Sequence, residues 1–170
     1  MRKSEVDDEV VPRERKKKSA AEALNALMRL CSRAEKSSGD ALRLMRTWGV
    51  EAREQQGVLD KLQEMRFIDD NRYAEAYTRE KSAMAGWGAR KIAQQLRLKG
   101  VSGEIISRVL KSLDSDEQAE RIEEKLRRKL RTTKYNSLFD LRGKLLRYGL
   151  GLGYDYDMVI EAIDKVVPQE

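Results

Sequence analysis

The chain has 170 residues, of which 38% are charged and only 6% are aromatic. This length suits one compact domain or a short array of small units, with room for a core of Leu, Ile, Val, Ala and Met. The sequence contains two prolines and is rich in strong helix formers. The composition therefore predicts an all-helical protein and disfavours a sheet.

The charge balance favours anionic partners. The formal net charge is +6 and the pI is about 9.4, which suits a phosphate backbone or an acidic protein surface without choosing between them. The sequence has no histidine and a single cysteine, so the commonest zinc ligand and general base are missing and no internal disulfide can form. We expect no enzymatic activity, no metal and no cofactor.

The N-terminal region and the hydropathy predict a soluble, cytoplasmic protein with no membrane partner. The sequence has no run of 18 apolar residues, the length needed to span a bilayer. Residues 1–18 carry charges at both ends and no apolar segment, unlike a signal peptide. They end in RERKKK, and we expect a flexible basic arm that serves either solubility or phosphate binding.

Helical periodicity begins at residue 19. In residues 19–34 the apolar side chains fall on one stripe at the spacing of a helix with one buried face; these are Ala20, Leu24, Leu27, Met28 and Cys31. Cys31 is therefore interpreted as a small core residue and not as a nucleophile, since no histidine is present to activate it.

The remaining segments continue this pattern as three groups of three helices. We expect helices within 19–34, 38–50 and 58–65, then 70–85, 88–101 and 104–113, then 115–130, 139–150 and 157–167. The second helix of each group is followed by a glycine, Gly49, Gly100 or Gly149. Because glycine enters the left-handed region without a Cβ clash, all three are expected to end helices.

The spacing of these glycines, about 50 residues, predicts three divergent copies of one unit. We divide the chain into an arm (1–18) and three repeats, 19–67, 68–113 and 114–170. Such units must stack on one another to bury enough surface, and a stacked array needs no second chain, so a monomer is expected. Ser102 is expected to cap one helix, and Ser115 to Gln118 match a capping box for another.

The adjacent carboxylates Asp69 and Asp70 have two possible interpretations: a metal or acid–base site, or the start of a helix. Neighbouring side chains diverge on a helix, and a hard cation needs several more oxygen ligands from one loop. A carboxylate at a helix start accepts hydrogen bonds from free N–H groups and complements the helix dipole. The helix start is the favoured interpretation.

The same stretch carries a recognisable motif. Ile68-Asp69-Asp70-Asn71-Arg72-Tyr73-Ala74 is followed by Gly88-Ala89-Arg90-Lys91-Ile92, by Leu96, by Lys99-Gly100-Val101 and by Glu104-Ile105-Ile106. In these residues the central unit resembles the bacterial RecX family. The first unit resembles it more loosely and the third only in its helix pattern. One departure is Arg66-Phe67, where many relatives have Gly-Tyr.

The resemblance implies an all-α protein of three tandem three-helix repeats stacked into an elongated, curved array. RecX proteins are known as non-enzymatic modulators, mostly inhibitors, of the RecA recombinase. The implied partner is the RecA filament, with single-stranded DNA contacted directly or through it, in recombination, DNA repair and the SOS response. Asp69, Asp70, Arg72, Tyr73, Gly88, Ile92 and Gly100 carry the structural signature.

Basic side chains off the apolar stripes are the candidate contacts for this partner, because guanidinium groups bind carboxylates and phosphates bidentately. Individually, most are expected to be solvated. The candidates are Arg43, Arg46, Arg90, Lys91, Arg97, Lys99, Arg108, Arg127, Arg128, Lys129, Arg131, Arg142, Lys144 and Arg147. Arg90 and Lys91 open a helix, where cations oppose the dipole, which favours a binding role.

The tryptophans and the overall function each allow a second interpretation. Trp48 and Trp87 stand beside glycines at helix ends, and core packing is favoured over stacking on single-stranded DNA. The alternative function is a generic helical nucleic-acid binder or a helix-turn-helix regulator, suggested by the pI and by short turns such as LRLKGVSGEII. The recurrence of that turn as a structural device, and the few base-reading groups on the following helix, argue against it.

Overall fold

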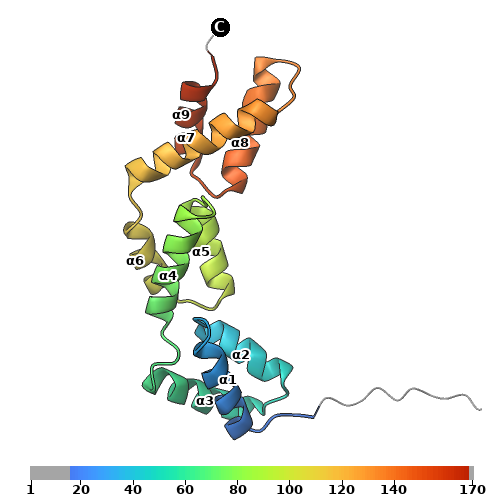
Figure 1. The fold of residues 1–170 in the computed structure, drawn as a ribbon, viewed down its shortest axis with the longest axis vertical. Helices are drawn as coiled ribbons and strands as arrows, with labels where there is room; N and C mark the ends of the chain where they lie inside the picture. Colours follow the sequence, from blue (N-terminus) through green and yellow to red (C-terminus); the bar gives the residue numbers. More distant parts are fainter. Residues whose placement is uncertain (1–15, 169–170) are drawn as a thin grey trace, which may run out of the picture.

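The computed structural model describes residues 16–168, which form nine α-helices and no strand. The bounds are α1 (Ala20–Cys31), α2 (Ser38–Thr47), α3 (Ala52–Glu64), α4 (Asp70–Ala83), α5 (Ala89–Leu98), α6 (Gly103–Lys111), α7 (Ser115–Thr132), α8 (Leu138–Gly151) and α9 (Tyr156–Val166). The helices form three successive groups, α1–α3, α4–α6 and α7–α9, which follow one another in a long, shallow arc (Figure 1). The predicted helical array is confirmed. Most of the expected arm, residues 1–15, lies outside the described part of the chain.

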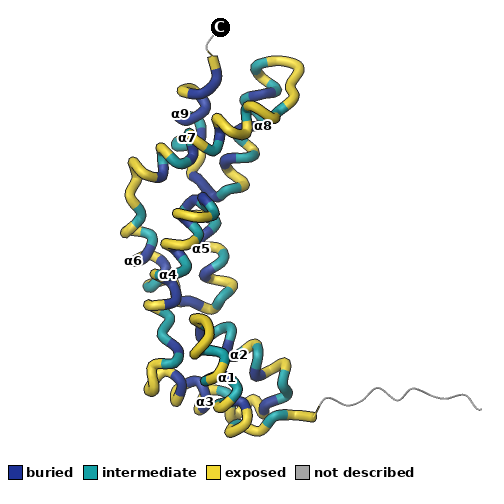
Figure 2. The backbone as a smooth tube through the Cα atoms, viewed as in Figure 1, coloured by how far each residue is buried: buried dark blue, intermediate teal, exposed yellow. Residues whose placement is uncertain are grey.

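Each group of helices has its own apolar core, and Figure 2 shows buried residues along the helices of all the groups. Buried side chains centre on Leu27, Met45 and Leu62 in the first group, on Ile92 and Leu96 in the second, and on Ile122, Leu126, Leu141, Leu145 and Ile163 in the third. Cys31 packs against the first core, and burial raises the pKa of its thiol. Both observations agree with the structural role predicted for this residue.

Side-chain caps fix most helix starts. Asp69 accepts from the amides of Asn71 (2.9 Å) and Arg72 (3.1 Å) at the start of α4, and Ser102 caps α6. Both predictions are confirmed. The predicted capping box at Ser115 is wrong, because Asp114 caps α7 by accepting from the amides of Asp116 and Glu117. A carboxylate one residue earlier takes the free N–H groups that the Ser115 hydroxyl was expected to satisfy.

The glycine stops are confirmed at two of three positions. Gly49 and Gly100 have φ of 70° and 75° and follow α2 and α5. Gly149 instead lies inside α8, which continues to Gly151, and Gly153 takes the left-handed conformation with φ of 90°. A Cβ at Gly149 would lie 2.6 Å from Cγ1 of Val159. This glycine therefore lets α9 approach α8 closely.

The turn after α3 shows what replaces glycine in this chain. Arg66 has φ of 58° and is the one non-glycine residue with positive φ in the part of the chain described. The RecX resemblance predicts glycine at this place, and Arg66 adopts the left-handed conformation that glycine favours. The helix before the turn also begins earlier than predicted, at Ala52, because polar helix formers give no apolar stripe to reveal its first turns.

The groups are joined end to end through their second helices. The amides of Gly88 and Arg90, at the start of α5, donate to the carbonyls of Leu152 (2.8 Å) and Gly153 (3.0 Å), at the end of α8. At the other end of α5, the Lys99 carbonyl accepts from the Ser37 hydroxyl that caps α2 (2.6 Å). The helices α8, α5 and α2 thus run head to tail, with negative helix ends against positive ones. We call this series the helix column.

Side-chain contacts stabilise both junctions, of which the first joins the first and second groups and the second joins the second and third groups. Asp70, the second carboxylate of the pair, accepts from the Ser38 amide (2.8 Å), and Arg72 pairs with Glu35 at 2.6 Å. At the second junction the buried Tyr154 hydroxyl donates to the Gly86 carbonyl (3.0 Å). The Asp69–Asp70 pair is thus divided between starting a helix and joining two groups. Within residues 16–168 no cluster of three or more metal-ligating side chains occurs.

None of the helices in residues 16–168 combines the length and the hydropathy that crossing a membrane requires.

Candidate functional site

The exposed face of the helix column carries four predicted arginines at corresponding positions. Each helix of the column is followed by a left-handed glycine: Gly49, Gly100 or Gly153. Six residues before these glycines stand Arg43, Gln94 and Arg147. Three residues before them stand Arg46, Arg97 and Leu150. All six are exposed. Because each set lies at an equal distance from the glycine that follows its helix, these side chains lie on corresponding faces of α2, α5 and α8. We call Arg43, Arg46, Arg97 and Arg147 the column lane.

Little within the molecule neutralises this lane. Arg43 pairs with Asp40 at 2.5 Å, whereas no carboxylate among residues 16–168 lies within ion-pair distance of Arg46, Arg97 or Arg147. Arginine cannot lose its proton near neutral pH, so the three guanidinium groups remain charged and hydrated. They have all five N–H donors available for an anionic partner.

The lysines of the N-terminal basic run meet one end of the same column. The Lys18 amide donates to the Trp48 carbonyl at the end of α2 (3.0 Å), and its ammonium lies 5.5 Å from the centroid of the Trp48 ring. A Cβ at Gly49 would lie 2.9 Å from Cγ of Lys17. Cations at a helix C-terminus complement the dipole. The basic run therefore leads directly onto the column.

The predicted cations at the two ends of α5 make contacts with the neighbouring groups. Arg90 pairs with Asp155 at 2.6 Å, and Lys99 with Asp40 at 3.3 Å. The Lys91 ammonium lies 4.3 Å from the centroid of the Trp87 ring, and its Cβ packs on Gly153. These contacts explain why two cations stand at the start of α5 against its dipole. Docking between groups therefore gives these cations a structural role, while their predicted binding role stays a prediction.

Asp40 is the electrostatic centre of the first junction. Burial raises the pKa of its carboxyl, but hydrogen bonds and charge from Arg43 and Lys99 outweigh that effect and hold the pKa below its usual value. Nearby, burial first and the Asp40 charge second raise the pKa of the Tyr73 hydroxyl to about 12. Asp40 therefore remains ionised, and it ties a column-lane arginine to a lysine of the next group.

The dense cationic run of α7 is largely paired on its own surface. Arg127 pairs with Glu123 at 2.6 Å, and Arg128 with Glu124. The hydrogen bond from Arg127 chiefly lowers the pKa of the Glu123 carboxyl. Such i,i+4 pairs offset part of the positive charge of this run. Exposed pairs of this kind are weak, so an external anion could still displace them.

The other predicted cations of the second and third groups have varied surroundings. Arg142 pairs with Asp164, and Lys144 with Asp140 at 2.7 Å, while Arg108 donates to Asn71. The Lys129 ammonium lies 5.2 Å from the centroid of the Tyr148 ring. Arg131 is exposed with no carboxylate partner in the described range. The column lane thus holds four of the predicted cations. Arg142 and Lys144 lie elsewhere on α8, and the rest lie at the ends of α5 or on α6 and α7.

Both tryptophans pack against apolar cores, which is the interpretation that the sequence favoured. Trp48 lies against the first core and Trp87 against the second. Lys81 and Lys91 both approach the Trp87 ring, at 5.5 Å and 4.3 Å from its centroid. Ring faces in contact with ammonium groups are poorly placed to stack on bases, which agrees with a structural role.

Sequence reasoning missed two basic residues that hold the second junction. Arg121 donates to the Ser82 hydroxyl (2.6 Å), and Lys125 to the Ala85 carbonyl (3.3 Å). Their partners lie 39 and 40 residues earlier in the chain. No local signal distinguishes them from other charged residues of α7, because the contact arises only when α7 packs on the end of α4.

Comparison with known proteins places this architecture in a family. Residues 69–110 match the family model of the RecX second three-helix domain. A regulatory protein RecX of Mycolicibacterium smegmatis is 34% identical over 117 residues, which cover 66% of this chain and 62% of the relative. The chain resembles the RecX family. A regulatory protein RecX of Halalkalibacterium halodurans is also 34% identical, over 114 residues that cover 66% of this chain and 43% of that relative.

Solved RecX structures share the fold. The crystal structure of RecX from Lactobacillus salivarius superposes with a TM-score of 0.72 at 21% identity, covering 86% of this chain and 96% of that one. A second crystal structure of regulatory protein RecX gives a TM-score of 0.74 at 22% identity, covering 85% and 71%. The match to the first curated relative spans about three fifths of its length.

Proposed function

We propose that this protein binds the RecA filament on single-stranded DNA and modulates it, mostly by inhibition, without catalysing a reaction of its own. The affected activities are filament extension, ATP hydrolysis, recombination and the coprotease activity. Kinship with regulatory RecX proteins supports this function. The observation that carries it is the column lane, which repeats cations along an elongated array.

The proposed mechanism is simultaneous binding of several repeats along one polymer. A filament presents the same anionic groups, phosphate or carboxylate, at regular intervals. An array whose cations recur on three consecutive helices can engage several of them at once, so that each added contact is intramolecular. Weak single contacts then give tight total binding, and the bound protein obstructs addition of further subunits.

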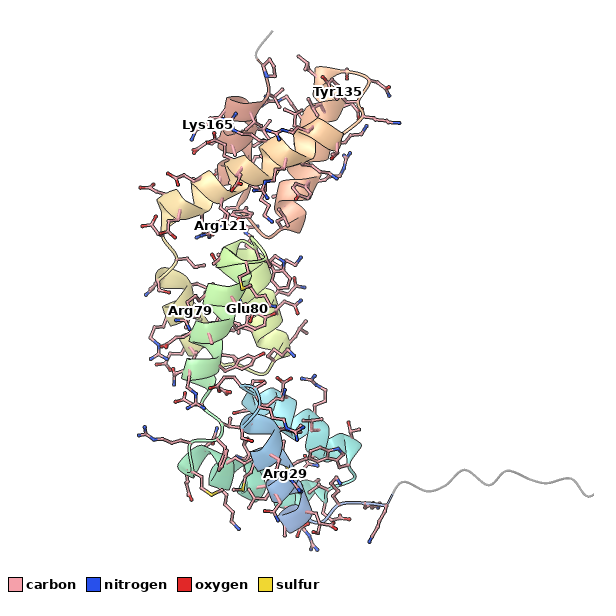
Figure 3. All side chains as sticks on the ribbon, in the orientation of Figure 1. Arg29, Arg79, Glu80, Arg121, Tyr135 and Lys165 are labelled. Atoms are coloured by element: carbon pink, nitrogen blue, oxygen red, sulfur yellow. The ribbon has the colours of Figure 1, made fainter. Side chains whose placement is uncertain are left out.

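The test is DNA-stimulated ATP hydrolysis by the cognate recombinase, titrated with this protein at fixed salt. The decisive variant is Arg46→Gln/Arg97→Gln/Arg147→Gln, which removes the three lane cations that have no carboxylate partner. The matched control is Arg29→Gln/Arg33→Gln/Arg53→Gln. It removes the same charge from exposed arginines outside the helix column, and Arg29 is labelled on α1 in Figure 3.

Inhibition by the original chain at low molar ratio, weakened about tenfold or more in the lane variant and little in the control, supports the proposal. Equal weakening in both variants indicates binding through net charge alone. No effect on hydrolysis, together with salt-sensitive binding to bare DNA, contradicts the proposal and favours the generic nucleic-acid binder. An Arg127→Ala/Arg128→Ala/Lys129→Ala variant tests separately whether the α7 run contributes.

A further inference from the structure

Two exposed aromatic rings lie at the start of α8. Tyr135, in the turn between α7 and α8, is 48% exposed, and Phe139, in the first turn of α8, is 88% exposed. The other aromatic side chains, except Tyr156, pack against one of the three apolar cores. Figure 3 labels Tyr135 at the end of the array farthest from the first group. Exposed apolar surface that gathers in one place is typical of a binding site.

Phe139 lies on the same face of α8 as the column lane. It is eleven residues before Leu150, which corresponds in position to Arg46 and Arg97. Eleven residues make three turns of an α-helix to within about 20°, so the two side chains lie on one line along α8. Because α5 contacts α8 at Leu152 and Gly153, the end of α8 that carries Phe139 is the free, positive end of the helix column.

Two cations beside the rings have no carboxylate partner within residues 16–168. Arg131, in the last turn of α7, and Lys134, in the turn that follows, are both exposed and belong to no ion pair in this range. The nearby carboxylate Asp140 accepts from the Lys144 ammonium (2.7 Å) and from the Asn136 amide (3.1 Å). These two hydrogen bonds, that of Lys144 first, hold the pKa of Asp140 below its usual value. The surroundings of the rings therefore keep an excess of positive charge.

Hydrogen bonds hold the turn that carries the rings against α8. The Lys144 ammonium donates to the Lys134 carbonyl (2.8 Å), and the Ser137 hydroxyl accepts from the Asp140 amide (3.1 Å). The Asn136 amide is tied to the same carboxylate. Both rings thus stand on backbone that is fixed to a helix, so little conformational entropy is lost when a ligand binds them.

This combination of groups restricts the chemistry of the ligand. Cations without internal partners favour an anion, and exposed ring faces favour flat groups that stack on them. Unpaired bases on a phosphate backbone supply both, and proteins that bind single strands combine the same two kinds of side chain. In a duplex the faces of the bases are covered by their neighbours. An acidic protein surface would match the cations alone.

We propose that the turn between α7 and α8 is a base-stacking contact for single-stranded DNA. Tyr135 and Phe139 stack on unpaired bases, while Arg131 and Lys134 bind the flanking phosphates. The inference deepens the proposed function and rests on it for the kind of nucleic acid, although the contact itself needs no recombinase. It adds to the charges of the column lane a contact that depends on the bases.

The experiment is fluorescence anisotropy of the full chain with fluorescein-labelled oligothymidylate at fixed, low salt. An oligomer of the same length with abasic sites in place of the thymidines carries the same phosphates and no bases. We expect the abasic oligomer to bind at least about fivefold more weakly, the effect of losing one base–ring stack. Equal affinity for the two oligomers overturns the proposal, as does the absence of saturable binding of oligothymidylate.

Variants of the rings tie this preference to the turn. Tyr135→Ala/Phe139→Ala should bind oligothymidylate at least about fivefold more weakly and no longer distinguish it from the abasic oligomer. Because both side chains are exposed, the fold should be kept, which circular dichroism checks. Phe139→Leu keeps an apolar side chain without a ring, so full affinity in this variant would contradict stacking. Tyr156→Ala is the matched control, since Tyr156 is 53% exposed at the start of α9, and it should leave the affinity unchanged.

The two cations give a second, independent contrast. Arg131→Gln/Lys134→Gln should weaken binding of oligothymidylate and of the abasic oligomer by the same factor, because both oligomers carry the phosphates. The preference for bases should then remain. A loss of the preference in this variant, with the rings intact, would contradict the assignment of the rings to bases and the cations to phosphates.

Unchanged affinity in the ring variant would show that the oligomer binds elsewhere, and it would overturn the proposal. If that variant nevertheless inhibits ATP hydrolysis less strongly than the original chain, the turn binds the recombinase protein instead of bases. Since the anisotropy measurement contains no recombinase, its failure is distinguishable from failure of the hydrolysis experiment, whose decisive residues are Arg46, Arg97 and Arg147.

Discussion

Gly39, near the start of α2, lies directly against Gly100, just past the end of α5. A Cβ built on Gly39 would lie 2.9 Å from the Cα of Gly100 and 2.3 Å from the Lys99 carbonyl oxygen. Gly88 and Gly153 repeat the arrangement at the second junction, where a Cβ on Gly88 would lie 2.4 Å from the Gly153 carbonyl oxygen. The helix column therefore depends on glycine at both junctions, because only backbone atoms fit between the helix ends.

We predict that Gly39→Ala destabilises the protein by about 1–3 kcal/mol, the usual cost of forcing a methyl group into a closely packed contact. The neighbouring atoms are backbone and cannot rotate away. Gly57→Ala is the control, since Gly57 lies inside α3 with nothing within 4 Å of an added Cβ. It should stabilise the helix by about 0.5–1 kcal/mol. Urea unfolding followed by circular dichroism measures both, and a neutral Gly39→Ala would contradict the close junction.

A second prediction separates two glycines of α8. Gly149→Ala should destabilise by about 1–3 kcal/mol, because its methyl group would meet Val159. Gly151→Ala should be neutral or stabilising, since nothing lies within 4 Å of its Cβ. In a double-mutant cycle, Val159→Ala should relieve part of the Gly149→Ala cost. Additive effects of the two substitutions would show that Gly149 and Val159 do not limit each other.

The third prediction concerns Arg66. Its φ of 58° is a conformation that glycine adopts without strain and that costs other residues about 1 kcal/mol. Arg66→Gly should therefore raise the free energy of unfolding, by up to about 1 kcal/mol. Met65→Gly, one residue earlier at φ of −79°, should lower it instead. Thermal unfolding of the two variants measures the contrast, and a loss of stability in Arg66→Gly would show that the turn is not strained.

The fourth prediction is a pH dependence centred on Asp40. Its folded-state pKa lies below the ordinary value of 3.8, so its contribution to stability is fully present above the unfolded pKa. The contribution is lost as the pH falls through the folded pKa. Asp40→Asn should lower stability at pH 7 by about 1 kcal/mol, because it removes the ion pairs to Arg43 and Lys99.

The difference between the original chain and Asp40→Asn should shrink below about pH 4, where the original carboxyl becomes protonated as well. Urea unfolding at intervals from pH 7 to pH 3 gives this profile. Asp60→Asn is a suitable control, since Asp60 is exposed on α3 and makes no ion pair within residues 16–168. A constant difference across the whole pH range would assign the Asp40 effect to packing instead of charge.

The sequence by itself determined the helices and their grouping. Apolar side chains at helical spacing, caps such as Asp69 and Ser102, and glycine at positions 49 and 100 act over a few residues, so their effect is readable locally. The motif around Asp69 to Ile106 likewise indicated the resemblance to the RecX family. Local reasoning failed at Gly149, because its signal is the same as that of a helix stop and the difference lies in the approach of α9.

Only the tertiary structure decided which charges are committed within the molecule. Arg90 and Arg97 both lie on α5, and the sequence favoured Arg90 as the binding residue. In the structure Arg90 pairs with Asp155, 65 residues away, while Arg97 remains without a carboxylate partner in the described range. The same holds for Asp70, whose partner Ser38 belongs to the preceding group. An ion pair or a cavity wall depends on where helix ends meet in space, and this long-range geometry leaves no periodic trace in the sequence.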